Sequence, residues 1–475
     1  MGSGRAYRNA DYVRVIVLIV CVSLLLVFYA STIRVSGGDE SSINRMHLSD
    51  IVRYYAHRIN DKVHAKPSRS KRVIVTGGLG FIGSHLVDRL LLDGHSVTIL
   101  DNMLTGRLEN VLPWLSHPRL QIIDHNIEKD IFLEADQIYH LASPTSLAYF
   151  KDKPIETVRS ISLGITTVLG LANRLRAKIL LVSTGAVYGS APANTYGVNG
   201  YYHLQSSSSN HVPVFRRRSS VFHTAPAIYS ASEHYWGAVN PSAPSSCYAQ
   251  GTRAAETMMY AYHRRNGVDV RVVRLFDTYG PRMRHMHTRS DRSRDGSVVG
   301  QLLDDSSYIG TCIAKALLNE DIVVPGDGLH MRTLTYVDDV VSALVKIMDS
   351  DKNESTQPIN IGSSHVTTLL DIAHFVKSFV GSNSSVVTSL SQRQYRHNQG
   401  KYLTSHENFL PSRKKTMTRD RSGYGHSTNG RSVVVPDISF AKWLLEWEPV
   451  MPIPLGMHLT VEYIKKELAE FGYLN

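Results

Sequence analysis

Three glycines near residue 80 have the spacing that a phosphate-binding turn needs. Gly77, Gly80 and Gly83 follow the apolar run Val73–Val75 and lead into Phe81–Leu86, whose pattern predicts a helix. Gly77 and Gly80 let the backbone turn tightly and approach a pyrophosphate, and Gly83 lets the helix pack close to the strand. Free N–H groups at the helix start then face the phosphate charge. The stretch predicts a strand, a turn and a helix that bind a dinucleotide.

An acidic residue follows where such a turn requires one. The apolar run Val97–Leu100 predicts a second strand that ends in Asp101, roughly 20 residues after the turn. A carboxylate at this place binds the ribose hydroxyls of NAD and repels the 2′-phosphate of NADP. We therefore predict NAD as the cofactor. The alternative is a glycine turn in another kind of α/β protein.

The remaining chain shows how these residues are held. From Lys71 onward apolar strand-like runs alternate with helix-like stretches, which is typical of βαβ units in a parallel sheet covered by helices on both faces. Further strands are expected at 121–123, 137–141, 178–182 and 270–275, and helices at 309–319 and 455–471. The last part of the chain is predicted to form a smaller cap over the carboxyl ends of the strands, where ligands bind in open α/β sheets.

Composition and charge narrow the function. The chain has 475 residues, 43% of them hydrophobic, and a net charge of +11 from 52 basic and 41 acidic residues. Much of the basic excess lies in three polar segments, 191–232, 284–307 and 391–432, which we interpret as solvated loops or, alternatively, as a docking surface for acidic polymers or lipid head groups. No aromatic-interleaved basic motif indicates nucleic-acid binding. The three cysteines are isolated and predict neither a disulfide framework nor a metal site.

The N-terminus predicts a membrane anchor. The apolar run from Val15 to Ile33 is just long enough to cross a bilayer as a helix. Arg5, Arg8 and Arg14 precede it, so the N-terminus is expected in the cytosol and the body in the lumen. The alternative is a cleaved signal peptide, although no small-x-small cleavage site follows the run.

Six stretches of the chain, including the glycine turn and the one that begins at Asp101, resemble one family. The chain is similar to the extended short-chain dehydrogenase/reductase superfamily and, within it, to UDP-glucuronate decarboxylase (UDP-xylose synthase). The resemblance covers nearly all of 71–470 apart from the polar segments. The matching stretches are Thr76–Val87, Asp101-Asn102 with Thr105-Gly106-Arg107, Tyr139–Pro144, Tyr235-Trp236-Gly237 with Val239–Pro241, Gly280–Met283 and Trp447–Pro449. The N-terminal anchor also resembles that of Golgi members, which implies a single-pass type II protein of the Golgi membrane.

The resemblance implies a fold class and a domain organisation. The fold class is α/β, with a Rossmann-type doubly wound parallel sheet, a smaller C-terminal substrate-binding cap and one N-terminal transmembrane helix. The implied division is a cytosolic tail (1–14), a transmembrane signal anchor (15–33), a stem (34–70), an NAD-binding domain (71–295, insert 191–232) and a UDP-sugar-binding cap (296–475, polar insert 391–432).

The family chemistry assigns roles to particular residues. NAD oxidises C4 of the glucuronate ring, the resulting UDP-4-keto sugar loses carbon dioxide, and reduction gives UDP-xylose. The resemblance makes Tyr248 the base, lets Thr184 hydrogen-bond the reacting hydroxyl, and places Arg332 at the sugar end. The cofactor-binding residues that it implies are Gly77, Gly80, Phe81, Ile82, Gly83, Asp101, Asn102, Thr105, Asn126, Ile127, Ser143 and Tyr248. The implied substrate-binding residues are Arg159, Arg174, Arg282 and Arg332.

The sequence departs from the family at the reacting centre. Thr252 stands where the Tyr-x-x-x-Lys pair has its lysine, one helical turn after the tyrosine. Without that charge a tyrosine has a pKa of about 10 and is a poor base at neutral pH. Gly185 and Ala186 stand where the family has a serine and a glutamate. Asp277 stands where the family has an asparagine, and the added negative charge of Asp277 would repel a pyrophosphate.

Two functions are therefore considered. The chain is either a lumenal UDP-glucuronate decarboxylase, weakened or compensated, or a catalytically silent paralogue that binds NAD and UDP-sugar and pairs with an active subunit. The family implies a homodimer through a helix bundle that includes the helix beginning near Tyr248. Asn353 and Asn383 begin glycosylation sequons, which matter if the body is lumenal.

Overall fold

The computed structural model describes residues 70–189, 227–243, 246–285, 308–350, 357–389 and 432–474. The predicted anchor and stem, most of the three polar segments and the sequon at Asn353 lie outside these ranges. The chain separates into two compact units, of which one comprises 69–449 with 459–475 and holds the main sheet and the candidate site.

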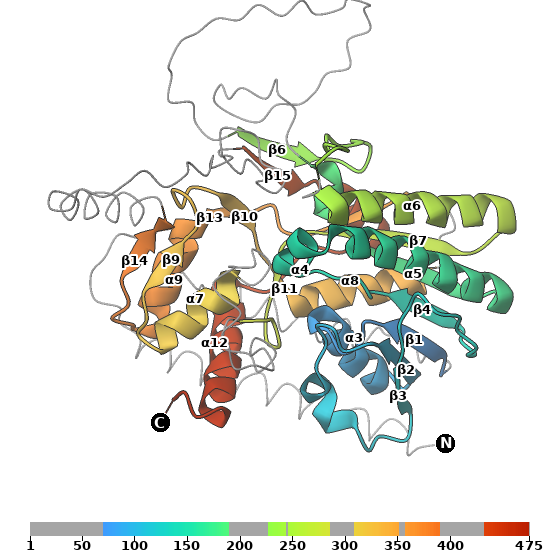
Figure 1. Cartoon of the computed structure of the whole chain (residues 1–475), viewed down its shortest axis with the longest axis horizontal. Coiled ribbons are helices and arrows are strands. Elements are labelled where there is room, and N and C mark those ends of the chain that lie inside the picture. Colours follow the sequence, from blue (N-terminus) through green and yellow to red (C-terminus); the bar gives the residue numbers. More distant parts are fainter. Residues whose placement is uncertain are drawn as a thin grey trace, which may run out of the picture. The chain divides into compact units, whose positions relative to one another are not determined.

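A seven-stranded parallel sheet organises this unit (Figure 1). Its strand order is β12-β7-β5-β4-β1-β2-β3. The strands are β1 (Arg72–Thr76), β2 (Ser96–Asp101), β3 (Leu120–Asp124), β4 (Gln137–His140), β5 (Lys178–Thr184), β7 (Val270–Leu275) and β12 (Ile359–Ile361). Strand order reverses between β1 and β4, and ligands bind at such a reversal, outside the carboxyl ends of the strands. The Rossmann-type sheet predicted from the sequence is confirmed, with each expected strand within two residues of its predicted bounds.

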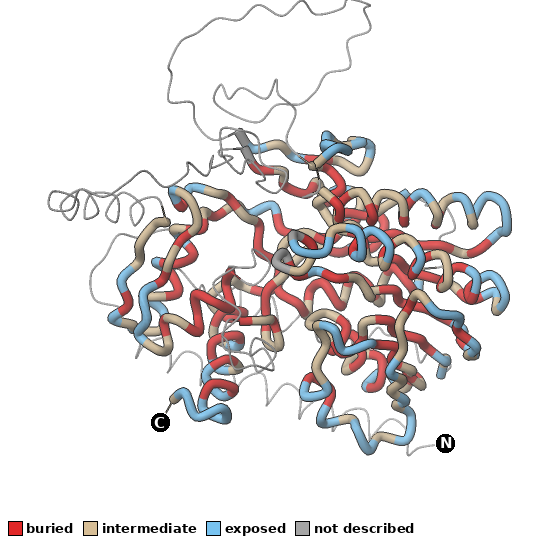
Figure 2. Tube along the Cα trace, viewed as in Figure 1, coloured by how far each residue is buried: buried red, intermediate tan, exposed pale blue. Residues whose placement is uncertain are grey.

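Helices cover both faces of the sheet. On one face α5 (Pro154–Leu175) and α6 (Cys247–Asn266) pack against each other and against β4, β5 and β7. On the other, α3 (Phe81–Leu92) and α8 (Val337–Asp349) pack together, α3 against β1 and β2 and α8 against β5 and β7. Because both faces are covered, the central strands β1 and β4 are buried along nearly their whole length rather than on alternate residues. Figure 2 shows the resulting core as buried trace along the strands and the inward sides of the helices.

Smaller elements complete the unit. The short helices and strands before residue 296 are η1 (Leu108–Trp114), α4 (Leu147–Asp152), η2 (Gly185–Tyr188), β6 (Ala227–Ala231) and β8 (Thr278–Tyr279). Those of the last part are α7 (Tyr308–Leu317), β9 (Ile322–Val324), β10 (Met331–Thr333), β11 (Thr335–Tyr336), β13 (Val366–Thr368), α9 (Leu369–Val380), β14 (Val386–Thr388), β15 (Ser432–Pro436), α11 (Ser439–Leu445) and α12 (Ile453–Glu470). The helices expected at 309–319 and 455–471 are thus present as α7 and α12.

The structure differs from the sequence prediction in two places. Residues 227–231, assigned to a solvated loop, form β6, which pairs in parallel with β15. The prediction was wrong because the partner strand lies about 200 residues further along the chain, and no pattern in the neighbouring sequence indicates the pairing. In addition α8 and β12, assigned to the cap, belong to the layers of the main sheet.

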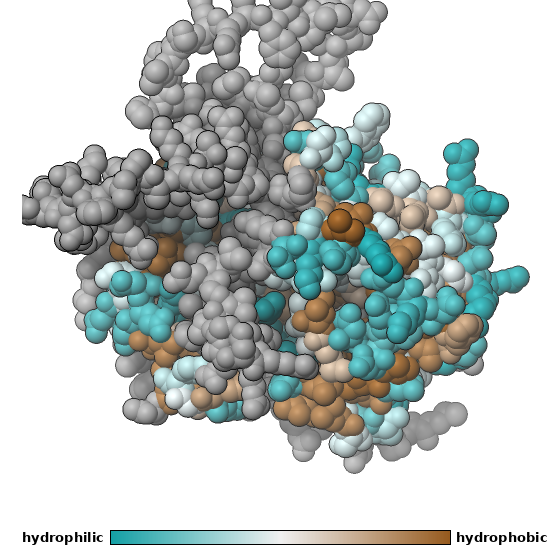
Figure 3. Space-filling model, in the orientation of Figure 1, coloured by the Kyte–Doolittle hydropathy of each residue, from teal (hydrophilic) through white to brown (hydrophobic). Residues whose placement is uncertain are grey.

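The surface of the helical layers is mixed. On the face shown in Figure 3, apolar side chains lie among polar ones over the described part of the chain. Within that part, α5 is long and apolar enough to cross a membrane, but 44% of its apolar window is buried and it packs against α6 and the sheet. It is therefore a core helix of the fold.

Candidate functional site

The glycine turn adopts the geometry that its sequence predicts. Gly77 has φ +71°, a conformation that favours glycine, and its N–H donates to the Leu100 carbonyl at 2.8 Å. A Cβ on Gly83 would lie 2.1 Å from the Gly77 carbonyl oxygen, so only glycine lets α3 approach the turn this closely. Gly80 is the N-cap of α3, and the first N–H groups of the helix have no partner within it. The turn therefore presents a cradle for an anion.

Asp101 ends β2 beside this cradle. Its carboxylate accepts hydrogen bonds from the Leu79 N–H at 3.0 Å and the Met103 N–H at 2.9 Å. Burial raises the pKa of Asp101, and these two N–H groups lower it. Each carboxylate oxygen keeps a further lone pair, which is what a ribose diol requires. The glycines, the helix start and Asp101 together fit the pyrophosphate and the ribose of NAD.

The other predicted cofactor residues lie around the same edge of the sheet. Asn102 and Asn126 each accept a backbone N–H two residues ahead through the side-chain oxygen. Ile127 is buried in the core against α5, so its side chain does not face a ligand. Phe81, Ile82, Thr105 and Ser143 are half-buried. Their predicted contacts with NAD stay predictions.

Tyr248, the predicted base, lies in the first turn of α6. Its ring stacks on that of Phe150, with centroids 5.5 Å apart and planes inclined by 10°. Burial raises the pKa of the Tyr248 hydroxyl, and a side-chain hydrogen bond with Ser143 lowers it. The tyrosine is thus brought close to the loop after β4, at the edge of the sheet where NAD would bind.

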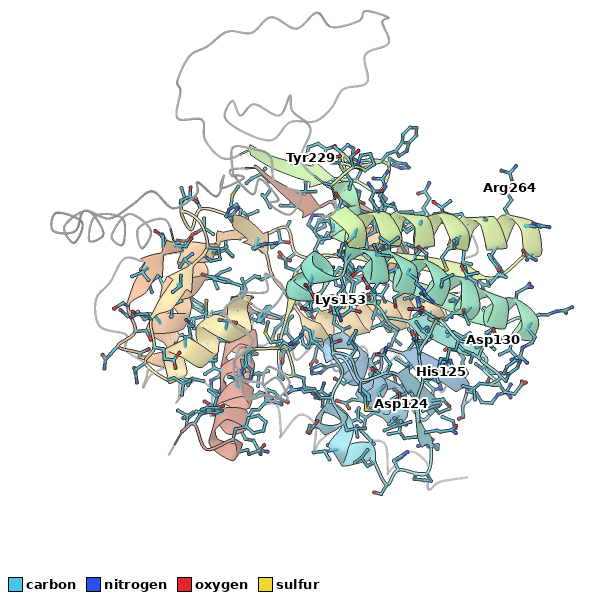
Figure 4. All side chains as sticks on the ribbon, viewed as in Figure 1. Asp124, His125, Asp130, Lys153, Tyr229 and Arg264 are labelled. Atoms are coloured by element: carbon cyan, nitrogen blue, oxygen red, sulfur yellow. The ribbon has the colours of Figure 1, made fainter. Side chains whose placement is uncertain are left out.

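Thr252 lies one turn along α6, and its side chain does not take over the role of the family's lysine. Its hydroxyl donates to the Tyr248 carbonyl oxygen at 2.8 Å, back along the helix. The adjacent Arg253 donates to the carbonyls of Val187 and Trp236. Arg264 lies at the far end of α6 and points outward (Figure 4). Neither arginine supplies the positive charge that the family places beside the tyrosine. Arg216, Arg217 and Arg218 lie outside the described residues.

Thr184 ends β5 and caps the short helix η2. Its hydroxyl oxygen accepts the Ala186 N–H at 3.2 Å and retains its own proton to donate. A Cβ on Gly185 would lie 2.9 Å from the Phe276 ring. The space of the missing serine is therefore already occupied by an aromatic side chain.

The four predicted substrate arginines lie in different places. Arg332 on β10 forms an ion pair with Asp277 at 3.7 Å, and Arg282 forms one with Asp88 on α3 at 2.7 Å. Arg159 near the start of α5 pairs with Glu128 at 3.1 Å. Arg174 donates to the carbonyls of Ile131 and Leu133, at the carboxyl end of α5 and the amino end of β4. That edge of the sheet is opposite the cradle, so the predicted role of Arg174 in binding substrate has no support from its position.

Comparison with known proteins identifies the family. A model of the GDP-mannose 4,6 dehydratase family matches residues 74–203, and one of the NAD dependent epimerase/dehydratase family matches 216–362. UDP-glucuronic acid decarboxylase 1 of Danio rerio is 36% identical over 398 residues, which cover 84% of this chain and 73% of the relative. UDP-glucuronic acid decarboxylase 6 of Arabidopsis thaliana is 32% identical, over 84% of this chain and 90% of the relative. The chain belongs to the UDP-glucuronic acid decarboxylase family.

A solved structure shows the same fold. UDP-glucose 4-epimerase from Thermotoga maritima, in complex with UDP-glucose, matches 84% of this chain and 99% of its own with a TM-score of 0.57. The sequence identity is 23%, so this likeness concerns the architecture alone.

The ion pair of Asp277 with Arg332 changes the expectation for the charge of Asp277. From the sequence, its charge was expected to repel a pyrophosphate. The carboxylate instead lies 3.7 Å from the Arg332 guanidinium, and both side chains are partly exposed, at 44% and 22%. The pair compensates the added negative charge within the site, at the cost of engaging the arginine predicted to bind the sugar end.

A buried polar network beneath the site was missed in the sequence. Glu256 on α6 accepts from Ser183 at 2.5 Å and from two nitrogens of Arg274 at 3.1 and 2.7 Å. Arg274 also donates to the Tyr188 hydroxyl at 3.0 Å, which in turn donates to Asn360 at 2.7 Å. Burial raises the pKa of Tyr188 to about 12, against the opposing effect of Arg274. The signal in the sequence that could have revealed this network is Arg274, a charged residue within a strand that is otherwise largely apolar.

We expect NAD to bind more tightly than NADP, because Asp101 repels the 2′-phosphate. Gly80→Val is expected to abolish NAD binding. Gly80 has φ −72°, which any residue adopts, and a Cβ there meets the Gly77 carbonyl oxygen at 3.2 Å, so the variant fills cofactor space with little change to the fold. Calorimetric titration with both cofactors measures this, and equal affinities would contradict the role given to Asp101.

Two glycine variants serve as controls for the fold. Gly83→Ala is expected to lower the free energy of unfolding by about 3 kcal/mol, the upper end of the usual cost of overpacking, because its Cβ collides with backbone. Gly170→Ala meets nothing within 4 Å on α5 and is expected to be neutral or to stabilise by about 0.5–1 kcal/mol. Thermal unfolding of Gly80→Val close to that of Gly170→Ala shows that its loss of binding is local.

Proposed function

We propose that this chain is an NAD-dependent UDP-glucuronate decarboxylase, which converts UDP-glucuronate into UDP-xylose and carbon dioxide through a UDP-4-keto sugar. The observation that carries the proposal is the 32–36% identity to UDP-glucuronic acid decarboxylases over 84% of the chain. The cradle formed by Gly77, Gly80, Gly83 and Asp101 supports the choice of cofactor.

The proposed chemistry assigns one task to each residue at the reacting centre. NAD, when bound, supplies the oxidant for C4 of the sugar. Tyr248 accepts the proton of the C4 hydroxyl, and Thr184 hydrogen-bonds that hydroxyl. Arg332 holds the sugar end of the substrate. In the 4-keto sugar the carboxylate is β to the ketone, so the electrons of the breaking C–C bond pass to the ketone oxygen as carbon dioxide leaves. Protonation at carbon and reduction at C4 complete UDP-xylose.

The comparisons do not favour the alternative of a silent paralogue. The residues at the reacting centre nevertheless predict a slow enzyme, because the raised pKa of Tyr248 is not countered by the positive charge that its family places at residue 252. General-base catalysis contributes about 10²–10⁴-fold. A rate limited by this step should increase when the charge is restored.

We expect Thr252→Lys to raise decarboxylation, and Thr252→Lys with Ala186→Glu and Gly185→Ser to raise it far more. The glycine change requires Phe276 to move, so the double variant without it is tested in parallel. Release of carbon dioxide and formation of UDP-xylose are measured with UDP-glucuronate, NAD and residues 71–475. Tyr248→Phe should erase any gain.

Thr257→Lys is the matched control. Thr257 lies on the same helix and makes the same hydrogen bond to a carbonyl four residues back, but it is exposed. If the unmodified protein already turns over at a rate that the changes do not improve, another residue assists Tyr248. If none of the variants releases carbon dioxide, the proposed activity is wrong.

We also propose a homodimer, or a pair with a paralogue, formed through α5 and α6. Ile155, Val158 and Leu163 on α5 are 78%, 37% and 43% exposed, although the helix is apolar. Val158→Asp with Leu163→Asp is expected to give a monomer in sedimentation, because charges would be buried in the interface. Leu112→Asp, an exposed apolar position on η1, is the control and should leave the assembly unchanged.

We further propose a single-pass type II protein of the Golgi membrane with its body in the lumen. Support comes from the apolar run between Val15 and Ile33 and the arginines before it. In sealed microsomes protease is expected to digest an N-terminal tag and to leave the body intact. Digestion of the body would refute this topology, and glycosylation of Asn383, which is an exposed residue, would support it.

A further inference from the structure

A buried ionic cluster joins α12 to the loop of residues 102–107, which follows Asp101. Glu467 on α12 contacts Arg107 through one carboxylate oxygen and His285 Nε2 through the other, the latter at 3.2 Å. The exposed fractions of these side chains are 9%, 11% and 0%. Burial raises the pKa of Glu467, but the His285 hydrogen bond and the Arg107 charge lower it below its usual value. Glu467 is therefore an ionised, buried partner of Arg107.

Arg107 ends the loop that follows Asp101. Its N–H donates to the Leu79 carbonyl at 3.0 Å, and the Leu79 N–H donates to the Asp101 carboxylate at 3.0 Å. The preceding Gly106 lies so close that a Cβ there would be 2.9 Å from an Asp101 oxygen and 2.9 Å from the Leu79 Cβ. The loop is thus packed directly against the ribose-binding carboxylate and the glycine turn.

The direction of the Asp101 carboxylate depends on this loop. The Asp101 carboxylate accepts from two backbone N–H groups, one in the glycine turn and one at Met103, which has φ +54°. A displacement of residues 102–107 would move the Met103 N–H and the wall that Gly106 forms. A hydrogen bond to a ribose hydroxyl loses strength rapidly when its angle or length changes.

We propose that Glu467 is a positioning residue for NAD: it holds Arg107, and with it the 102–107 loop, so that Asp101 faces the adenosine ribose. Glu467 does not touch the cofactor. The inference rests on the proposed cofactor site and is independent of whether the chain turns over. It gives α12, near the C-terminus, a part in a site built from residues 76–107.

The test is NAD binding by calorimetry with the full-length chain. Glu467→Gln keeps the shape of the side chain and removes its charge, and we expect the Kd for NAD to rise about tenfold, which corresponds to about 1.4 kcal/mol. The Kd for UDP should stay within about twofold. Glu470→Gln is the matched control, because it makes the same change on the same helix at an exposed ion pair with Lys466.

A double-mutant cycle identifies the partner. Arg107→Met is expected to weaken NAD binding as much as Glu467→Gln, and the double variant should be no weaker than either, because both remove one interaction. If Glu467→Gln is too unstable for binding to be read, Arg107→Lys takes its place, since lysine keeps the charge and loses the planar fork.

Three results would overturn the inference. They are an unchanged Kd for NAD in Glu467→Gln or Arg107→Lys, equal losses of NAD and UDP affinity, and strictly additive effects in the cycle. The second result would mean that the cluster only stabilises the fold. Failure of the unmodified protein to bind NAD would instead refute the proposed cofactor site.

Discussion

The close approach of α3 to the glycine turn before it sets the position of the other parts of the site. With a Cβ at Gly83 only 2.1 Å from the Gly77 carbonyl, no other residue lets the helix start so near β1. That approach aims the first N–H groups of α3 at the edge of the sheet where the strand order reverses between β1 and β4. Asp101, the 102–107 loop and Tyr248 are all arranged around this point, and each would lose its function if the helix moved outward.

The buried polar network beneath the reacting centre is intact, whereas residues of the reacting centre itself differ from the family. Below it, Glu256 and Arg274 tie α6 to β7, and Ser183 joins β5 to the same carboxylate. Removing one member of such a buried pair costs about 3–5 kcal/mol, so the fold strongly retains it. Thr252, Gly185 and Ala186 take no part in the hydrogen bonds described for this network, so a change there can affect the chemistry without breaking it. This division explains how a chain can preserve the cofactor cradle and lose the charge beside Tyr248.

The sequence predicted the features that short-range patterns determine. The glycine spacing, the apolar runs of the strands and the placement of Asp101 depend on contacts within about 30 residues, and the sheet was confirmed. Contacts between distant segments were not foreseeable. Neither the β6–β15 pair, nor the ion pair of Asp277 with Arg332, nor the cluster of Arg107, His285 and Glu467 has a local signature. For the same reason, the position of Arg174 at the opposite edge of the sheet and the burial of the Ile127 side chain in the core became visible only in the structure.

The late origin of β12 has a consequence for biosynthesis. This edge strand, with α8 on the face beside it, comes from residues 337–361, whereas its neighbour β7 ends at Leu275. A chain leaving the ribosome therefore displays the open edge of β7, with unpaired N–H and C=O groups, while the next 86 residues, from 276 to 361, are made. Such an edge is a template for pairing with other chains. Nascent protein should depend on chaperones during this interval more than after it, and premature termination before residue 361 should produce aggregates rather than a smaller folded domain.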